Sequence, residues 1–253
     1  MNYTELKKIW LAEEAAAHIH GWDFSHIEGR FNNGEDKLEW DYVQIVREYL
    51  SPEKRLLDID TGGGEALLSF GHPYKMTSAT EAYPPNVKLC EETLLPLGID
   101  FRKAENYADM PFESESFDIV INRHGAYDVS ELRRILKDGG IFVTEQVGCE
   151  NDRGLVEFLC PNAEQKFKGW NLENNLRRFE ENGFTILKQG ECFRPIEFYD
   201  VGALVWFARI IEWEFLGFSV LNNFEQLCRA QEIIEKHGKV SGNNHRFLIA
   251  AKK

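Results

Sequence analysis

Carboxylates and glycines alternate in one short stretch of the chain, which reads Asp58-Ile59-Asp60-Thr61-Gly62-Gly63-Gly64. The stretch lies between an apolar run typical of a buried parallel strand and an apolar pattern at helical spacing. Glycines in such a strand-turn-helix unit allow positive φ and let a ligand lie against bare main chain, while the N–H groups of the next helix favour an anionic or acceptor-rich ligand. We therefore expect a cofactor above Gly62–Gly64.

The spacing of the glycines narrows the choice of cofactor. A dinucleotide fingerprint needs G-x-G-x-x-G, but Leu67 stands at the third glycine position, and no Gly-Lys-Ser/Thr of a P-loop occurs. The stretch resembles motif I of the class I S-adenosylmethionine (SAM) dependent methyltransferases, with Asp60 where that family usually has its first glycine. The resemblance implies SAM, or its product S-adenosylhomocysteine, with Gly62 and Gly64 under the methionine moiety. The cofactor-binding residues expected here are Asp58, Asp60, Thr61, Gly62 and Gly64.

An acidic residue follows the next predicted strand, residues 75–80. Glu81 comes about 20 residues beyond the glycines, where one carboxylate can accept hydrogen bonds from both hydroxyls of a ribose. We therefore predict that Glu81 binds the ribose of the cofactor.

A third part of the site is implied by resemblance alone. The segment from Lys103 to Ile121 is similar to a family signature in which an acid and the following backbone N–H recognise adenine. Lys103 stands where the acid usually falls, so the resemblance implies that Ala104, through its backbone, and Glu105, through its side chain, contact the adenine.

The predicted strand 117–122 carries Asn122 and His124 to the carboxyl edge of the sheet, where ligands bind in doubly wound folds. Asn122 is a further cofactor-binding candidate. Methyl transfer is an in-line displacement, so a base is needed only when the nucleophile is protonated. His124 is the candidate for that catalytic role, and a hydrogen-bonding or packing role near the cofactor is the alternative.

The elements that must position these residues alternate between strands and helices. This order predicts an α/β fold with a doubly wound sheet. The family resemblance, which includes a segment ending in Gly139-Gly140, implies a seven-stranded, Rossmann-like sheet with an antiparallel last strand. The expected domains are an N-terminal helical cap (1–50), a SAM-binding core (51–194), a helical insertion or lid (195–243) and a final core strand (244–253).

Composition limits the partners. The net charge of −13 over 253 residues repels phosphate backbones, so a nucleic-acid substrate is not expected. Five scattered cysteines without C-x-x-C and histidines without ligand spacing predict no disulfide frame and no metal site. No signal peptide and no apolar run of membrane-spanning length are found, which predicts a cytoplasmic protein without a membrane partner.

The sequence as a whole is similar to bacterial methyltransferase-domain proteins of unassigned substrate. We expect an enzyme that transfers a methyl group from SAM to a small-molecule acceptor. Three alternatives remain: an RNA or protein methyltransferase, a degenerate SAM-binding protein without catalysis, and a nucleotide-binding oxidoreductase. Neither the acceptor nor the oligomeric state follows from the sequence.

Overall fold

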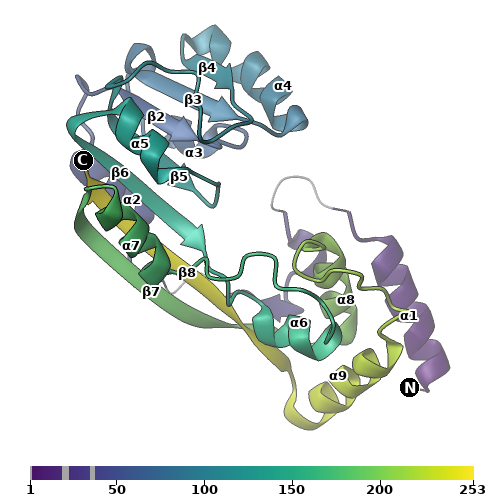
Figure 1. Ribbon diagram of the computed structural model, residues 1–253. Helices are drawn as coiled ribbons and strands as arrows, with labels where there is room; N and C mark the ends of the chain where they lie inside the picture. The colour runs from purple at the N-terminus through teal and green to yellow at the C-terminus, as the bar shows by residue number, and fades with distance from the viewer. Residues whose placement is uncertain (1, 19–22, 35–37) are drawn as a thin grey trace. The chain divides into compact units, whose positions relative to one another are not determined.

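The structure is a computed structural model that describes residues 2–18, 23–34 and 38–253. The chain forms two compact units, each of which is described by itself. The helical unit comprises the described residues of 1–38, 148–169 and 193–245, and the sheet unit comprises 39–147, 170–192 and 246–253. Figure 1 labels the helices and strands.

The sheet unit is built on seven strands that are hydrogen-bonded in the order β7-β8-β6-β5-β2-β3-β4. Strands β2 to β6 are mutually parallel, and β8 pairs antiparallel with β6. Their bounds are β2 Leu56–Ile59, β3 Thr77–Glu81, β4 Asp100–Lys103, β5 Phe117–Arg123, β6 Leu136–Val147, β7 Thr185–Phe198 and β8 Val240–Lys252.

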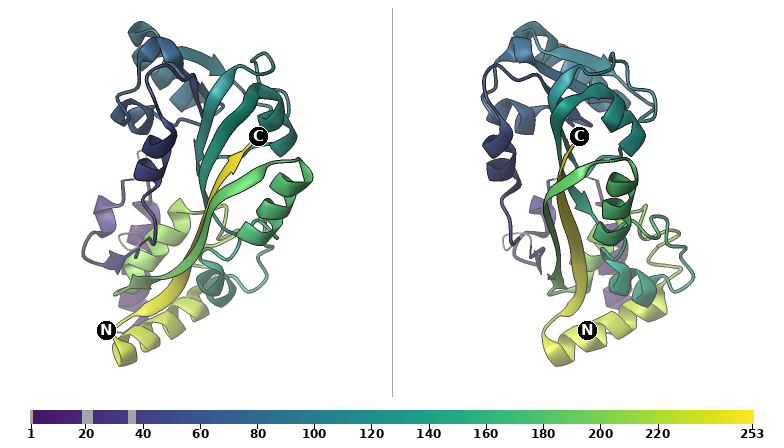
Figure 2. Two further views of the ribbon diagram at one scale, coloured as in Figure 1. Left: turned by 90° about the vertical axis from the view of Figure 1, so that its left-hand side faces the viewer. Right: turned by 60° about the vertical axis from the view of Figure 1, so that its left-hand side comes forward.

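Helices cover both faces of this sheet. One apolar cluster joins α5 and α7 to the sheet, and a second cluster joins α2, α3 and α4 to the opposite face. The right-hand view of Figure 2 shows α5 and α7 on one side of the strands and α2 on the other. The bounds are α2 Tyr42–Tyr49, α3 Glu65–Ser69, α4 Pro84–Thr93, α5 Val129–Ile135 and α7 Leu172–Glu181.

Strand register brings the carboxyl ends of the parallel strands together. Ile59 at the end of β2 pairs with Thr80 of β3 and with Asn122 of β5. Arg123 pairs in turn with Glu145 of β6. The segments that follow these strands therefore meet at one edge of the sheet, as expected for a doubly wound fold.

The helical unit is organised around α8, Val201–Ile210, nine of whose ten residues are buried. Its apolar cluster also includes side chains of α1 (Tyr3–Ala15), α6 (Arg153–Leu159) and α9 (Phe224–His237). The short strand β1, Phe31–Asn32, pairs antiparallel with the end of β7 that lies in this unit. The aromatic residues of the segment 195–243 are mainly core: Trp206, Phe207, Phe215 and Phe218 are buried.

The predicted fold class is confirmed: the sheet is mixed, helices pack on both faces, and the last strand is antiparallel to its neighbour. The structure differs in detail, because β1 adds an eighth strand and β7 and β8 extend into the helical unit. Among the described residues, no helix is long and apolar enough to cross a membrane.

Candidate functional site

The turn after β2 takes the backbone conformation that its sequence predicts. Asp60, Gly62 and Gly64 have φ angles of 56°, 64° and 87°, and Gly64 is the N-cap of α3. A Cβ placed on Gly62 would find no atom within 4 Å. The main chain at Gly62 is therefore open to a ligand, which is the fit that a cofactor lying against bare backbone requires.

Asp58 lies in β2, and Thr61 lies in the turn that follows this strand. Both residues are buried, and the Thr61 hydroxyl donates a hydrogen bond of 2.7 Å to Asp58 Oδ2. The Thr61 N–H donates to the carbonyl of Thr80 on β3. Burial raises the pKa of Asp58 to about 7. The negative charges of Asp60 and Glu81 also raise this pKa, whereas the hydrogen bond from Thr61 lowers it.

The raised pKa of Asp58 predicts a pH-dependent stability. Between the unfolded pKa near 4 and the folded pKa near 7, the folded chain binds more protons at this carboxyl than the unfolded chain, so stability falls as pH rises. Asp58→Asn keeps an acceptor for Thr61 and should reduce the loss of unfolding free energy between pH 4 and pH 8 by roughly 2 to 4 kcal/mol. Urea unfolding of both proteins measures this difference, with Asp138→Asn, an exposed carboxylate, as control. Parallel stability curves for Asp58→Asn and the unsubstituted protein would contradict it.

Glu81 is a buried carboxylate that anchors the glycine turn. Its Oε2 accepts hydrogen bonds from the Gly62 N–H at 2.8 Å and from Asn86 Nδ2 at 3.3 Å. Its Oε1 accepts from the N–H groups of Ala82 and Tyr83, at 2.8 and 3.0 Å. The longest of these bonds, from Asn86, is the one that a ligand hydroxyl would displace at lowest cost.

Asp60 joins two other segments of the same edge. Tyr107 donates its hydroxyl proton to Asp60 Oδ2 at 2.8 Å, and the Ala126 N–H also donates to this carboxylate. Burial raises the pKa of Asp60 to about 6; the Tyr107 bond opposes the rise and the charge of Glu81 adds to it. The residue that departs from the family pattern is therefore held in place by partners of its own.

Gly125 makes this arrangement possible. A Cβ at Gly125 would lie 2.5 Å from Asp60 Oδ2 and 2.6 Å from Asn122 Nδ2. The segment after β5 can therefore approach Asp60 so closely only because residue 125 has no side chain.

Gly125→Ala is expected to destabilise the protein by about 1 to 3 kcal/mol, because the added methyl group must displace Asp60 or Asn122. Chemical denaturation measures the change. The control is Gly154→Ala in α6, where an added Cβ would meet no atom within 4 Å; it should be neutral or slightly stabilising. Equal stabilities for the two variants would show that the close approach at Gly125 is not needed.

The segment after β4 carries the adenine candidates. The Ala104 N–H donates to the carbonyl of Glu81 at 3.1 Å, so this donor is already engaged within the protein. Glu105 is exposed and forms an ion pair of 2.5 Å with Lys103, whose charge lowers the pKa of the Glu105 carboxyl. Lys103, the departure from the family signature, thus neutralises the acid beside it.

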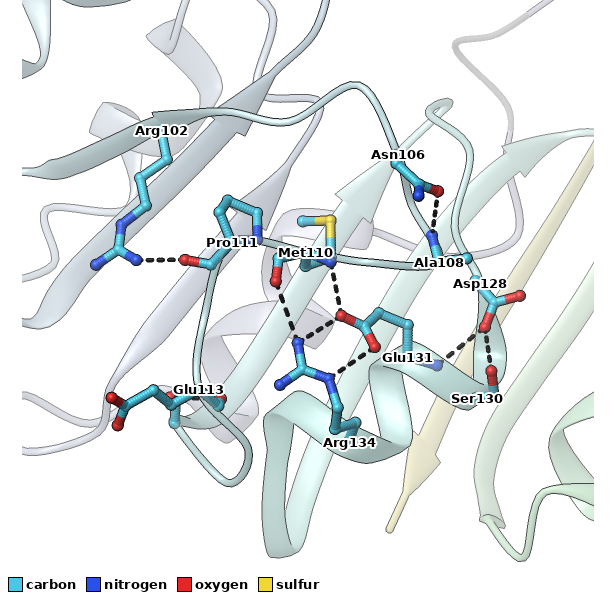
Figure 3. Close-up of polar contacts among 11 residues, drawn as sticks. Arg102, Asn106, Ala108, Met110, Pro111, Glu113, Asp128, Ser130, Glu131 and Arg134 are labelled. Atoms are coloured by element: carbon cyan, nitrogen blue, oxygen red, sulfur yellow. Dashed lines mark hydrogen bonds and ion pairs between the residues drawn. The ribbon is translucent and has the colours of Figure 1, made fainter.

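Helix α5 anchors the loop that follows β4, as Figure 3 shows. Glu131 accepts a 2.6 Å hydrogen bond from the Met110 N–H, and Arg134 bonds both Glu131 and the Met110 carbonyl. Asp128 caps the helix by accepting from the Glu131 N–H. This network supports the loop on which Tyr107 reaches Asp60.

Asn122 is fully buried, and both ends of its amide are hydrogen-bonded to neighbouring strand ends. Its Nδ2 donates to the Ile59 carbonyl at 3.0 Å, and its Oδ1 accepts from Gln146 Nε2 at 2.6 Å and Thr144 Oγ1 at 3.3 Å. These bonds tie the ends of β2, β5 and β6 together. The arrangement favours a role in positioning the strand ends over direct contact with a ligand.

His124 lies at the same edge with a φ of 63°. The backbone N–H of His124 donates to the carbonyl of Glu145, and the ring Nε2 is 3.7 Å from Glu145 Oε1. Loss of surrounding water and the positive charges of Arg246 and Arg123 lower the pKa of His124, so the ring is neutral at pH 7. A neutral imidazole with a lowered pKa can accept a hydrogen bond but is a weak base.

The structure thus places Asp58, Asp60, Thr61, Gly62, Gly64 and Glu81 around one turn, with Asn122 and His124 on the adjacent strand end. Sequence reasoning missed Tyr107, Gly125 and Glu145. An isolated glycine after a predicted strand is a signal of close backbone approach, and this signal could have identified Gly125. Tyr107 and Glu145 carry no local signal, because their contacts join segments far apart in the chain. Among the described residues, no group of three or more His, Cys, Asp or Glu side chains could hold a metal ion.

Comparison with known proteins gives concordant results. Residues 57–144 match a family described as a methyltransferase domain. The phthiotriol/phenolphthiotriol dimycocerosates methyltransferase of Mycobacterium leprae (strain TN) is 33% identical over 99 residues, which cover 34% of this chain and 35% of that protein. YcgJ of Bacillus subtilis (strain 168), named an uncharacterized methyltransferase, is 28% identical over 116 residues, 42% of this chain and 46% of that protein.

The matched region spans less than half the length of these curated relatives. Solved structures extend the similarity in fold. The YcgJ structure covers 84% of this chain and 97% of its own at a TM-score of 0.55 and 18% identity. A functionally unknown protein from Deinococcus radiodurans R1 covers 95% of this chain and 96% of its own at a TM-score of 0.57 and 14% identity. Over residues 57–144, about a third of its length, the chain is therefore similar to the methyltransferase-domain family, and the solved structures show that it shares their fold.

Proposed function

We propose that this protein transfers a methyl group from SAM to a small-molecule acceptor. The observation that carries the proposal is the open main chain at Gly62, whose N–H is anchored by the buried carboxylate of Glu81. A cofactor with a ribose and an amino-acid end fits this pair, because the bare backbone accepts the chain of the ligand and the carboxylate accepts the diol.

The roles of the chain's own residues follow from their contacts. Glu81 would hold the ribose, the turn at Gly62–Gly64 the methionine end, and the loop at Ala104–Glu105 the adenine edge. Bound SAM would supply an electrophilic methyl group on a sulfonium. Asn122 would hold the strand ends in position, and neutral His124 would accept a hydrogen bond from the attacking group. Positioning accounts for most of the rate in such a displacement.

A small-molecule acceptor is supported by charge. The net charge of −13 opposes binding of a phosphate backbone, so transfer to RNA would require a basic patch that the sequence hardly shows. Binding of a nucleic acid would also weaken steeply with salt, which distinguishes this alternative experimentally.

Calorimetric titration with SAM, with NADH and ATP as control ligands, tests the proposal. We expect a micromolar dissociation constant for SAM and none measurable for the controls, followed by transfer of a labelled methyl group to members of a small-molecule library. Tighter binding of NADH would instead indicate an oxidoreductase.

A SAM-binding protein without transfer is the second candidate. Asp60 at the usual glycine position and the weak basicity of His124 favour it. Micromolar SAM binding with no methyl transfer to any acceptor class would select this candidate.

A further inference from the structure

The carboxyl edge of the sheet unit carries an arginine that the proposed cofactor site does not use. Arg123 is the last residue of β5 and directly precedes His124. Its side chain is 49% exposed, whereas the Glu145 side chain opposite it is 2% exposed. A guanidinium is thus presented to solvent at the place where the proposed acceptor must approach His124.

Glu145 holds this guanidinium by one side only. Arg123 Nε donates to Glu145 Oε1 at 3.0 Å, and Trp40 Nε1 donates to the other carboxylate oxygen at 2.7 Å. In the described part of the chain, the two terminal nitrogens of Arg123 have no hydrogen-bond partner. The guanidinium also lies over the ring of Tyr42, 5.7 Å from its centroid. The planar group is therefore oriented, with its terminal N–H groups available to a bidentate ligand.

The charges around His124 differ in sign from those around the glycine turn. The positive charges of Arg246 and Arg123 both act on the His124 ring, and the carboxylate of Glu145 lies 3.7 Å from its Nε2. On the cofactor side, three acids, Asp58, Asp60 and Glu81, are grouped around the turn. An anion is therefore favoured beside His124, and a cation beside the turn.

We propose that Arg123 binds a carboxylate of the methyl acceptor, so that the acceptors of this protein are small carboxylic acids. The inference rests on the proposed function, because it assigns Arg123 to the acceptor of that reaction. Glu145 acts as a positioning residue, which fixes the guanidinium through Nε and leaves its outer edge for the ligand. Trp40 satisfies the remaining oxygen of Glu145 and so keeps this carboxylate from binding both terminal nitrogens itself.

Binding of benzoate and benzamide, followed by NMR with and without saturating S-adenosylhomocysteine, tests this assignment. The two probes have nearly the same shape and differ in charge. We expect benzoate to bind at least about 10-fold more tightly than benzamide and to shift the Arg123 Nε–Hε resonance. Equal binding of both probes, or benzoate binding without a shift at Arg123, would overturn the proposal.

Variants separate recognition from folding. Arg123→Gln should abolish the preference for benzoate, and Arg123→Lys, which keeps the charge beside Glu145 but loses the planar fork, should retain a reduced preference. Arg133→Gln on α5, an exposed arginine that bonds the Gly183 carbonyl, is the matched control and should behave as the unsubstituted protein. A benzoate preference that survives Arg123→Gln would overturn the assignment.

The titration of benzoate and benzamide without S-adenosylhomocysteine tests the role of Arg123 even if S-adenosylhomocysteine does not bind. Failure of S-adenosylhomocysteine to bind would separately refute the proposed function. A labelled-methyl screen of paired acids and carboxamides adds the substrate readout. Transfer to the acid members supports the proposal, and transfer only to neutral or cationic compounds contradicts it.

Discussion

Glu81→Gln is expected to weaken SAM binding by about 100-fold, which corresponds to roughly 2.8 kcal/mol. Each carboxylate oxygen of Glu81 accepts hydrogen bonds from two N–H donors, and a glutamine would replace one of these oxygens with an amide nitrogen. It would face either Gly62 and Asn86 or Ala82 and Tyr83. A donor opposite two donors leaves both without acceptors, and the charge available to the ribose diol is lost as well. Isothermal titration with SAM measures the effect.

Glu91→Gln is the matched control for this prediction. Glu91 is exposed on α4, so the substitution makes the same change of charge without altering a buried carboxylate. We expect its effect on SAM affinity to stay below about threefold, as for a screened surface charge. If both variants weaken binding equally, the general negative charge of the region would matter rather than the buried carboxylate of Glu81.

The local part of the site could be predicted from the sequence because its signals lie within a few residues of one another. A buried strand followed by glycines specifies the turn at Gly62, and an acid at the end of the next strand specifies Glu81. Parallel strands align their carboxyl ends, so these two residues had to meet, and the 2.8 Å bond between the Gly62 N–H and Glu81 agrees with that expectation.

The remaining contacts could not be predicted because they depend on loops that return from distant strands. Tyr107 reaches Asp60 from the segment after β4, and Trp40 reaches Glu145 across more than one hundred residues. Nothing in the sequence around Tyr107 or Trp40 distinguishes these side chains from core aromatics. Their roles follow from which carboxylate each ring can reach.

The set of segments that form the helical unit could not be predicted from the sequence, for the same reason. The helical unit combines three separate stretches, 1–38, 148–169 and 193–245, and its core helix α8 is almost entirely apolar. Hydrophobic periodicity identifies such a helix as buried but does not say which segments bury it.

Asp60 is expected to make the cofactor site prefer SAM over S-adenosylhomocysteine in a pH-dependent way. The two ligands differ by the methyl group and the positive charge of the sulfonium, so an ionised carboxylate beside the turn favours SAM. The pKa of Asp60 is raised to about 6, and Asp60 is therefore mostly protonated at pH 5 and ionised at pH 7.5. The ratio of the two affinities should increase by about 10-fold over this range, equivalent to roughly 1.4 kcal/mol.

Asp60→Asn isolates this effect, because asparagine keeps an acceptor for the Tyr107 hydroxyl and removes the titrating charge. The affinity ratio of this variant should change much less between pH 5 and pH 7.5. Asp58 titrates nearby with a pKa of about 7, so Asp58→Asn measures the part contributed by the buried acid of the turn. SAM and S-adenosylhomocysteine share their amino-acid and adenosine parts. The effect of pH on the binding of these parts therefore cancels in the ratio of the two affinities. A ratio that is constant with pH in the unsubstituted protein would mean that Asp60 serves only to hold Tyr107 and Ala126, and that its charge does not act on the ligand.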